Sequence, residues 1–563
     1  MSLRERSSPE ERRIFIESIT ATSDSDLFDF LAEEVLDQQP EETRNFLLTT
    51  SILQQITPEI AERLAGVHDG QKELTGLQHG GLFTNRLDEH RYRYHNLFRD
   101  FLERRLNMER SEAEVIGLHI HAASYFETTQ QWPEAIHHYL RAGLQRQAAR
   151  LIAKYGEDIV SSGRLGLVDE WLQRLPSEMI NGNARLSLLY GEARGISGEW
   201  ERALDAIQRA RSYFARKGDR RLEALACLKL SSVYSNYGDA ERAVEAAEAG
   251  VLLVPSDAVG TRLRLEGNLA VTRMWLAGSL DAVVRECQRI AAEATALGLD
   301  HFAAIGFHNA GEMQLRMGNV KHAISSMEKS ARFWAETPTN PFAFSEDLTM
   351  ALIADGQGAR ARSFAIESIR RTAPWPRPKA HALHAWSTVL ASEGQLAEAI
   401  EALREATASP QVLGAVHSLI FARLIELMFV EGRPSRDISE VVDALKAGPP
   451  VDPRYVAELA PALAIGEHLS PACGGACQKG LRVLNTAELT GARFVASQGR
   501  VKIGALALEH RALRPKRKAW DALAEAVDAG FTAPIRWWVR RYAPHAKDVL
   551  RTADGAQLIA TLV

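Results

Sequence analysis

The segment Ser-Gly-Glu-Trp-Glu-Arg-Ala at residues 197–203 returns in altered form along most of the chain. Related segments are Tyr-Gly-Asp-Ala-Glu-Arg-Ala at 237–243, Met-Gly-Asn-Val-Lys-His-Ala at 317–323 and Glu-Gly-Gln-Leu-Ala-Glu-Ala at 393–399. Their glycine recurs at intervals of 40 and then 38 residues, as Gly198, Gly238, Gly278, Gly318, Gly356, Gly394 and Gly432. A glycine in a left-handed turn ends one helix, and a polar residue after it opens the next. A fixed period of this length predicts stacked helical hairpins.

These hairpins resemble tetratricopeptide repeats of a longer period. The family favours a small residue seven positions before the glycine, and Gly191, Ser231, Gly311 and Ser387 fit that pattern. Other repeats depart from it with Val271, Thr349 and Ile425, and Val283 replaces the alanine expected after Gly278. The resemblance implies an all-α fold with a tetratricopeptide-like superhelix, an α-solenoid, over residues 183–513. An irregular helical bundle is the alternative.

Composition limits the classes of function. The chain has 563 residues, 46% of them hydrophobic and 25% charged, with a formal net charge of −5. This balance argues against extensive coating by nucleic acid. Four cysteines do not make a disulfide framework, so a reducing cytoplasm is the expected location. The first residues lack a signal-peptide core, and no apolar run approaches the ~20 residues that span a bilayer. We expect a soluble cytoplasmic protein without membrane contact.

The N-terminal third predicts a winged-helix module. After a polar tail over 1–26, helical spacing begins near Asp26, a second helix follows Pro40, and a third runs from Thr57 to Gly66. Residues 80–95 alternate around an Asp-Glu turn, which indicates two short strands, and helical spacing resumes at 96–106. Three helices and a hairpin make a winged-helix-like domain over 27–107.

This stretch is similar to the winged-helix region of the large MalT-like regulators, which are STAND-class NTPases with LuxR-family output domains. The segments that carry the resemblance are Leu31-Ala-Glu-Glu-Val-Leu-Asp-Gln-Gln-Pro, Phe46-Leu-Leu-Thr-Thr-Ser-Ile-Leu and Tyr92-Arg-Tyr-His-Asn-Leu-Phe-Arg-Asp-Phe-Leu. Leu118-His-Ile-His-Ala-Ala-Ser-Tyr-Phe and Trp171-Leu-Gln-Arg-Leu-Pro continue it. The resemblance implies a helical arm over 108–182 that joins the module to a sensor.

Two parts of such regulators are not found in the sequence. No Gly-x-x-x-x-Gly-Lys-Ser/Thr string is present to hold nucleotide phosphates, and no helix-turn-helix counterpart follows about residue 480. The resemblance also places His95 where a histidine touches bound nucleotide, a role that needs an NTPase domain; the alternative is a histidine that caps the next helix. We therefore expect the sensor and regulatory portion of a regulator of transcription.

The candidate ligand site follows from helical geometry. In tetratricopeptide hairpins the first helix lines the concave face, through positions 13, 10, 6, 3 and 2 before the turn glycine. Counted from the seven turn glycines, which we call the glycine ladder, the predicted inner surface consists of Glu192, Ser232, Asn236, Asn268, Thr272, Trp275, His308, Glu312, Arg316, Glu346, His381, His384 and Glu426. Trp275 is the expected anchor, because its ring can stack on a planar face. The alternative is that these side chains only solvate the groove.

Other groups of residues give weaker evidence for a functional site. Basic and aromatic residues at 511–542 favour polar capping helices over 514–563 rather than a nucleic-acid site. Cys473 and Cys477 lack the second ligand pair of a structural zinc site. A metal site would need the His381–His384 and His308–Glu312 pairs to converge across repeats, so we predict no metal. The sequence offers no catalytic set at interpretable spacing, so we predict neither an enzyme nor a cofactor.

The predicted function is sensing. A small-molecule inducer, or a protein or peptide, binds in the concave groove and shifts the array between arrangements. A stand-alone scaffold for protein–protein interaction is the alternative, and nucleic-acid binding through the winged helix is a third possibility. DNA contact is expected to be indirect or weak, and self-association is possible.

Overall fold

The structure, a computed structural model, describes residues 32–33, 35–79, 83–277, 279–335, 346–410, 413–448, 456–469, 492, 495–496, 498–499 and 502–503. Within these ranges the side chains of 274–277, 334–335 and 467–468 are not described. Several expectations fall outside the described residues: the tail at 1–26, the Cys473–Cys477 loop, the basic-aromatic stretch at 511–542 and the capping helices at 514–563.

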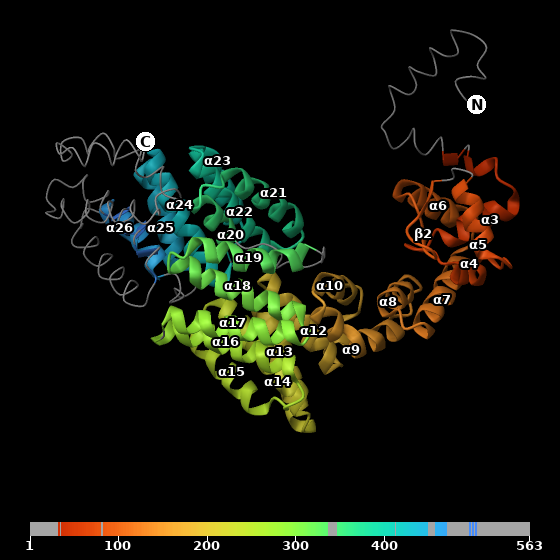
Figure 1. Cartoon of the computed structure of the whole chain (residues 1–563), viewed down its shortest axis with the longest axis horizontal. Helices are drawn as coiled ribbons and strands as arrows, with labels where there is room; N and C mark the ends of the chain where they lie inside the picture. The colour runs from red at the N-terminus through yellow and green to blue at the C-terminus, as the bar shows by residue number, and fades with distance from the viewer. Residues whose placement is uncertain are drawn as a thin grey trace, which may run out of the picture. The chain divides into compact units, whose positions relative to one another are not determined.

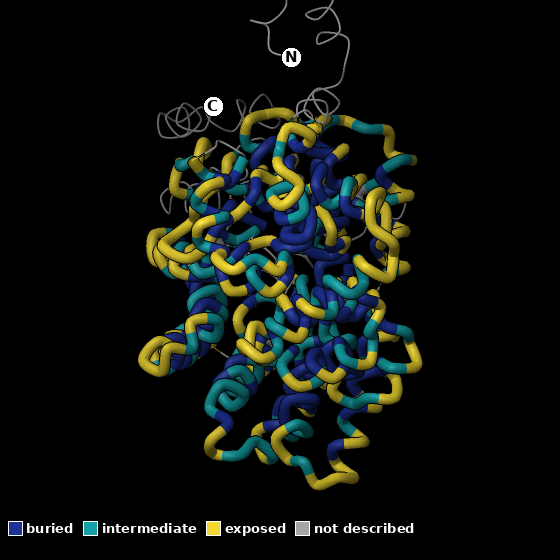
Figure 2. The backbone as a smooth tube through the Cα atoms, turned by 90° about the vertical axis from the view of Figure 1, so that its right-hand side faces the viewer, coloured by how far each residue is buried: buried dark blue, intermediate teal, exposed yellow. Residues whose placement is uncertain are grey.

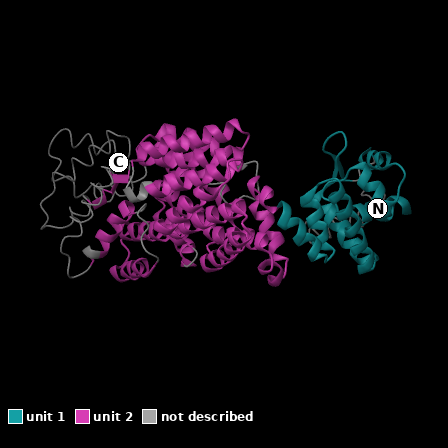
Figure 3. Cartoon of the chain, turned by 90° about the horizontal axis from the view of Figure 1, so that it is seen from below, with its two compact units in different colours: residues 1–155 teal, residues 156–563 magenta. Residues whose placement is uncertain are grey.

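The chain divides into two compact units, Met1–Tyr155 and Gly156–Val563, each described here by itself (Figure 3). The described residues are overwhelmingly helical, and the strands that they contain are confined to one hairpin. The all-α prediction is confirmed (Figure 1). No helix among the described residues combines the length and the apolar character that crossing a bilayer requires.

The first unit begins with the winged helix. Its elements are α3 (Glu41–Thr50), α4 (Pro58–Ala65), α5 (Gly70–His79), β1 (Thr84–Arg86), β2 (Tyr92–Tyr94) and α6 (Asn96–Glu109). The strands pair antiparallel with Asn85 opposite Arg93, and Ile56 bridges to Tyr92 from the other side. Asp88 closes the hairpin turn by accepting hydrogen bonds from the backbone amides of His90 and Arg91, at 3.0 and 2.9 Å.

Helix α5 was not expected from the sequence. Gly70 and Gly76 lower the intrinsic helix propensity of this segment, so the local sequence pattern does not predict a helix here. Burial of Leu74 and Leu77 stabilises the helix, and the Asp69 carboxylate accepts a hydrogen bond from the Lys72 amide at 2.9 Å. Tertiary packing here outweighs propensity.

A run of helices follows the winged helix: α7 (Glu112–Thr128), α8 (Trp132–Arg141), α9 (Gln145–Ser161), α10 (Leu165–Gln173) and α11 (Ser177–Asn181). Ser111 and Glu114 form a capping box that starts α7. The boundary between the two units falls inside α9.

The second unit contains the repeat array. Its elements are α12 (Ala184–Ser197), α13 (Trp200–Lys217), α14 (Arg220–Tyr237), α15 (Ala240–Leu253), α16 (Val259–Ala277), α17 (Leu280–Ala296), α18 (Asp300–Arg316), α19 (Val320–Ala335), α20 (Glu346–Ala354), α21 (Gly358–Thr372), α22 (Pro376–Ser392), α23 (Leu396–Ala406), the 3₁₀ turn η2 (Gly414–Val416), α24 (His417–Glu431), α25 (Ser435–Ala447) and α26 (Val456–His468). Consecutive helices pack as hairpins, beginning with α12 and α13.

The glycine ladder ends helices as predicted. Six of its glycines have φ between 78° and 107°, a left-handed conformation that side chains with a Cβ rarely adopt: Gly198, Gly238, Gly318, Gly356, Gly394 and Gly432. Gly278 lies outside the described residues. Five positions after the turn glycine the side chain is buried in each hairpin from α12 to α23, as in Ala203, Ala243 and Ala323, and Val283 fills the same place at 5% exposure. In Figure 2 the inner faces of the helices are buried and the outer turns are exposed.

The superhelix of the second unit closes on itself. Helix α22 packs against α12, and η2 packs against α14, although about 200 residues separate each pair of elements along the chain. At this contact, which we call the seam, the Arg377 guanidinium donates to the Asn236 side-chain oxygen at 3.1 Å and lies 5.6 Å from the centre of the Trp200 ring. Gly414 completes the seam with φ 56°.

Candidate functional site

An internal cavity of about 440 Å³ lies within the repeat array. Its walls come mainly from the first helices of successive hairpins, α12, α14, α16, α18, α20, α22 and α24. Further lining residues come from α26 and from Val495, Gln498, Gly499 and Lys502. First helices line the inside because the second helix of each hairpin packs outside them. The concave groove expected from the sequence is therefore a cavity whose walls meet at the seam.

Twelve of the thirteen predicted ligand residues line this cavity: Glu192, Ser232, Asn236, Asn268, Thr272, His308, Glu312, Arg316, Glu346, His381, His384 and Glu426. The side chain of Trp275 is not described, so its role as an anchor stays a prediction. Ligand binding by the twelve residues also stays a prediction; the structure establishes that they share one wall.

The sequence analysis did not include several polar and charged residues that line the cavity. Lys229, Asn309, Asp347 and Arg423 all lie nine positions before a turn glycine, and all four line the cavity. That position lies one helical turn after position 13, so the 3.6-residue period would have included it. Arg377, Glu458 and Lys502 also line the cavity, but they lie outside this pattern and enter through tertiary packing.

At one end of the cavity a buried lysine joins two carboxylates. The Lys229 ammonium, 1% exposed, lies 3.0 Å from Glu157 and pairs with Glu192. Arg264 approaches Glu192 to 3.9 Å. Burial by itself raises the pKa of Glu192, but Lys229 and Arg264 outweigh burial and hold that pKa below its usual value. Burial wins at Glu157, whose pKa is raised.

At the other end, ion pairs connect distant parts of the chain. The Arg316 guanidinium lies 3.3 Å from Glu312 and 2.7 Å from Glu458, which is 142 residues away. The Lys502 ammonium donates to both oxygens of Glu426 at 2.9 and 2.8 Å. Burial lowers the pKa of Lys502 to about 8, although Glu426 opposes the shift. These pairs tie α26 and residue 502 to the cavity wall.

Two histidines share a carboxylate in the middle of the wall. Glu346 Oε2 lies 2.8 Å from His384 Nδ1 and 3.5 Å from His381 Nδ1. Burial raises the pKa of Glu346, but the two histidines outweigh burial and bring that pKa well below its usual range. Burial lowers the pKa of His381 and of His308, so both imidazoles are neutral near pH 7.

The described lining is balanced in charge, with six carboxylates and six cationic side chains. The carboxylates are Glu192, Glu312, Glu346, Asp347, Glu426 and Glu458, and the cations are Lys229, Arg264, Arg316, Arg377, Arg423 and Lys502. The wall as a whole therefore has no excess of charge of one sign. It offers hydrogen-bond donors and acceptors around a space of the size that small molecules occupy in proteins, roughly 300–1,000 Å³.

His95, in the first unit, is exposed and takes the N-cap position of α6, where its side chain makes no capping hydrogen bond. The expected position of this histidine at the start of the following helix is therefore confirmed. The backbone amide of His95 donates to the Phe83 carbonyl at 2.7 Å and links the helix to the hairpin. A role in nucleotide sensing stays a prediction.

The sequence is similar to several known proteins. A family model described as the MalT winged helix domain matches residues 32–114. The transcriptional regulator MalT of Klebsiella pneumoniae (strain 342) is 35% identical over 167 residues, which are 29% of this chain and 18% of that protein. MalT of Serratia proteamaculans is 27% identical over 314 residues, which are 54% of this chain and 34% of that protein.

The serine/threonine-protein kinase PknK of Mycobacterium tuberculosis (strain ATCC 25618 / H37Rv) is 31% identical over 219 residues, 37% of this chain and 20% of the kinase. The chain thus spans about a third or less of the length of these curated relatives. Among solved structures, a STAND protein with a tetratricopeptide repeat sensor from Pyrococcus horikoshii aligns with 79% of this chain and 70% of its own, at 15% identity and a TM-score of 0.35. At that TM-score the two folds are only loosely alike, and the assignment rests on the sequence match and on the helical hairpins.

The matched segment contains the helices α3 to α6 and the hairpin of the first unit, and left-handed glycines separate the two helices of the hairpins in the second unit. The chain is therefore a MalT-like region, in which a MalT winged helix domain is followed by a tetratricopeptide-like array.

Proposed function

We propose that this chain is the sensor portion of a MalT-like transcription regulator, and that the cavity of the second unit binds a small polar inducer without catalysing a reaction. One observation carries the proposal: a cavity of about 440 Å³ lies inside the repeat array and is lined by side chains from seven successive first helices. A ligand in this space would contact several repeats at once and so bias their mutual arrangement.

The balanced charges of the wall favour a neutral or zwitterionic ligand rich in hydrogen-bonding groups. Lys229, Arg316 and Lys502 already have carboxylate partners, so an anionic ligand would have to displace a buried ion pair, which is costly. Two amide side chains are better placed to select a ligand. Asn268 donates to the Ser232 hydroxyl at 2.9 Å, and Asn309 lines the same cavity.

Ligand binding to the folded protein raises its stability, so a rise in Tm can be used to detect binding. A ligand that binds only the folded array adds about 2.7 kcal/mol to the free energy of unfolding at a concentration 100 times its Kd. We would screen neutral and zwitterionic metabolites, sugars and amino acids among them, for a rise in Tm of the full chain. Calorimetry would then give the affinity of the hits.

Two cavity variants and one control test the site. Asn268→Ala and Asn309→Ala should each weaken binding of a hit about five- to tenfold at a nearly unchanged Tm of the free protein, since each removes a hydrogen bond worth about 1 kcal/mol. Gln288→Ala, on the exposed face of α17, should leave the affinity unchanged. Equal affinity in all three variants would place the ligand elsewhere, and a partner protein or DNA bound without any small molecule would favour the scaffold or the winged-helix alternative.

A further inference from the structure

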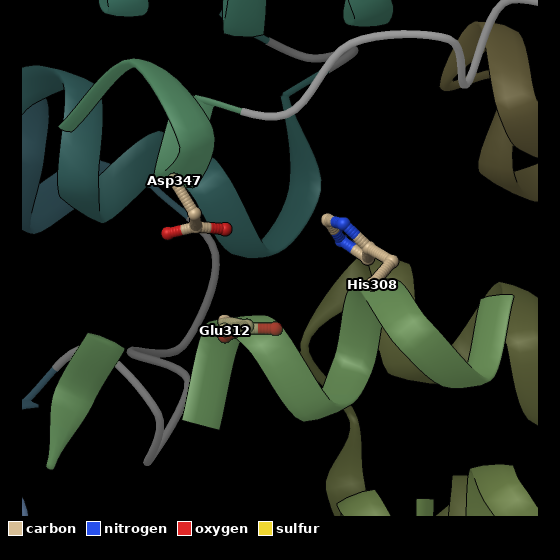
Figure 4. A group of neighbouring side chains, drawn as sticks. All are labelled: His308, Glu312 and Asp347. Atoms are coloured by element: carbon tan, nitrogen blue, oxygen red, sulfur yellow. The ribbon is translucent and has the colours of Figure 1, made fainter. Parts of the chain in front are cut away.

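Three potential metal ligands from two hairpins face a common space in the cavity wall. His308 and Glu312 are four residues apart on α18, so their side chains lie on one face of that helix. Asp347, the second residue of α20, meets them from the next hairpin. Figure 4 shows the imidazole and the two carboxylates turned toward the space between them.

The distances are close to those of a coordination shell. One ligand atom from each residue lies within 4.8 Å of the others. Ligands at about 2.1 Å around a tetrahedral ion lie about 3.4 Å apart, so the three groups need to approach one another by at most about 1.4 Å, which side-chain torsions supply. Arg316 holds Glu312 in place through one carboxylate oxygen at 3.3 Å.

An independent observation lies in the same wall. His384 is 3% exposed, and its Nδ1 lies 2.8 Å from the carboxylate of Glu346, the residue next to Asp347. The other ring nitrogen, Nε2, is buried and has no hydrogen-bond partner.

We propose that His308, Glu312 and Asp347 bind one divalent first-row transition-metal ion. A set of one imidazole and two carboxylates suits Zn²⁺ or Mn²⁺ better than Mg²⁺ or Ca²⁺, which prefer oxygen ligands alone. Three protein ligands leave at least one coordination position open toward the cavity. That position takes water, or an oxygen atom of a molecule in the cavity. The site requires no inducer, so its test is separate from that of the sensing function.

The test uses the tag-free full chain, cleared of metal with a chelator and titrated with Zn²⁺ in a calorimeter. We expect one tight site, with binding at least about tenfold weaker in His308→Ala, Glu312→Gln and Asp347→Asn, because each variant removes one of three ligands. His322→Ala is the matched control: the residue is exposed on the neighbouring helix α19, and its loss should leave the tight site intact. Co²⁺ absorption gives a second readout of the coordination shell, and Mg²⁺ in excess should not compete.

Melting curves show that each variant is folded. Asp347→Asn and Glu312→Gln preserve side-chain shape, so at least these two remain informative if His308→Ala unfolds. Wild-type Zn²⁺ affinity in the folded carboxylate variants would overturn the proposal. A folded wild-type chain whose tight Zn²⁺ binding is absent, or is removed by His322→Ala, would overturn it equally.

Discussion

At the scale of single residues, the buried ionisable groups of this chain are held by specific partners. Lys229 pairs with two carboxylates, and Lys502 pairs with Glu426. A buried charge without a partner would cost several kcal/mol, so these pairs determine which neighbours can pack together. They are weak evidence for stability and stronger evidence for a single arrangement of the helices.

A histidine pair in the first unit is buried in the neutral form, in contrast to the buried lysines, which are charged and paired with carboxylates. His119 on α7 and His138 on α8 are each 3% exposed, and their Nδ1 atoms lie 2.8 Å apart. One ring donates and the other accepts, so protonation of both would set two donors against each other. Burial lowers the pKa of His119 to about 4 and that of His138 to about 2.

This pair should make the first unit sensitive to acid. In the unfolded chain both histidines titrate near pH 6.5, so below that pH the unfolded state binds protons that the folded state rejects. Stability is therefore full above pH 7 and falls as the pH drops below about 6.5, down to about pH 4 for His119 and about pH 2 for His138, by about 2 kcal/mol per histidine at pH 5. Hydrogen exchange of α7 and α8, corrected for intrinsic rates, should show this loss of protection.

Two variants separate the pair from other titrating groups. The double variant His119→Gln/His138→Gln should lose most of the pH dependence, whereas His121→Gln, at an exposed position of α7, should retain it. The same loss of protection in the double variant would assign the acid sensitivity to other groups.

At the scale of elements, the position seven residues before each turn glycine determines how closely two helices pack. A Cβ at Gly191 would lie 2.4 Å from Ile207 Cγ1 and 3.0 Å from the Ala203 carbonyl oxygen. The equivalent serines, Ser231 and Ser387, are fully buried, and only the hydroxyl of Ser387 has a hydrogen-bond partner. The position therefore selects a small side chain rather than a polar one.

Gly191→Ala should destabilise the second unit by about 1–3 kcal/mol, because the added methyl group pushes α12 away from α13. Gly267→Ala is the matched change inside α16, where the nearest atom to the new Cβ lies at 3.7 Å. It should stabilise by up to about 1 kcal/mol, since alanine loses less conformational entropy in a helix than glycine does. Urea unfolding followed by circular dichroism measures both variants, and shifts of the same sign would contradict the packing argument.

At the scale of the whole second unit, the seam determines whether the array encloses a cavity or an open groove. Gly414 lies where a Cβ would be 2.5 Å from the Asn236 carbonyl oxygen and 2.6 Å from the Trp200 ring. Both neighbours are held in place, by helix α14 and by the stack of Arg377 on Trp200. The two sides of the seam can therefore meet only because residue 414 is a glycine.

Gly414→Ala should open the seam. We expect faster hydrogen exchange at the ends of α14 and α22 that meet there, and weaker binding of any cavity ligand, with the separate hairpins still folded. Gly358→Ala, where no atom lies within 4 Å of the new Cβ, is the control and should change neither quantity. Unchanged exchange in the Gly414 variant would mean that the seam is not a gate for the cavity.

Local rules were sufficient to predict the repeats and the winged helix. A left-handed glycine, a small residue seven positions before it and an alanine five positions after it act within one hairpin, so the period of the sequence predicts the hairpins and the face that lines the inside. Twelve inward-facing residues were predicted in this way, and the same period would have included Lys229 and Asp347. Local rules failed at α5, where burial of Leu74 and Leu77 outweighs two glycines.

Only the tertiary structure decided that the array closes. Arg377 meets Asn236, and Arg316 meets Glu458, across about 140 residues in each case. These meetings depend on small rotations between successive hairpins, which add up over the array and which no single repeat encodes. The packing of one hairpin on the next brings Asp347 to His308 and Glu312. The sequence by itself therefore determined which residues face inward, and the arrangement of the hairpins in space determined which of them meet.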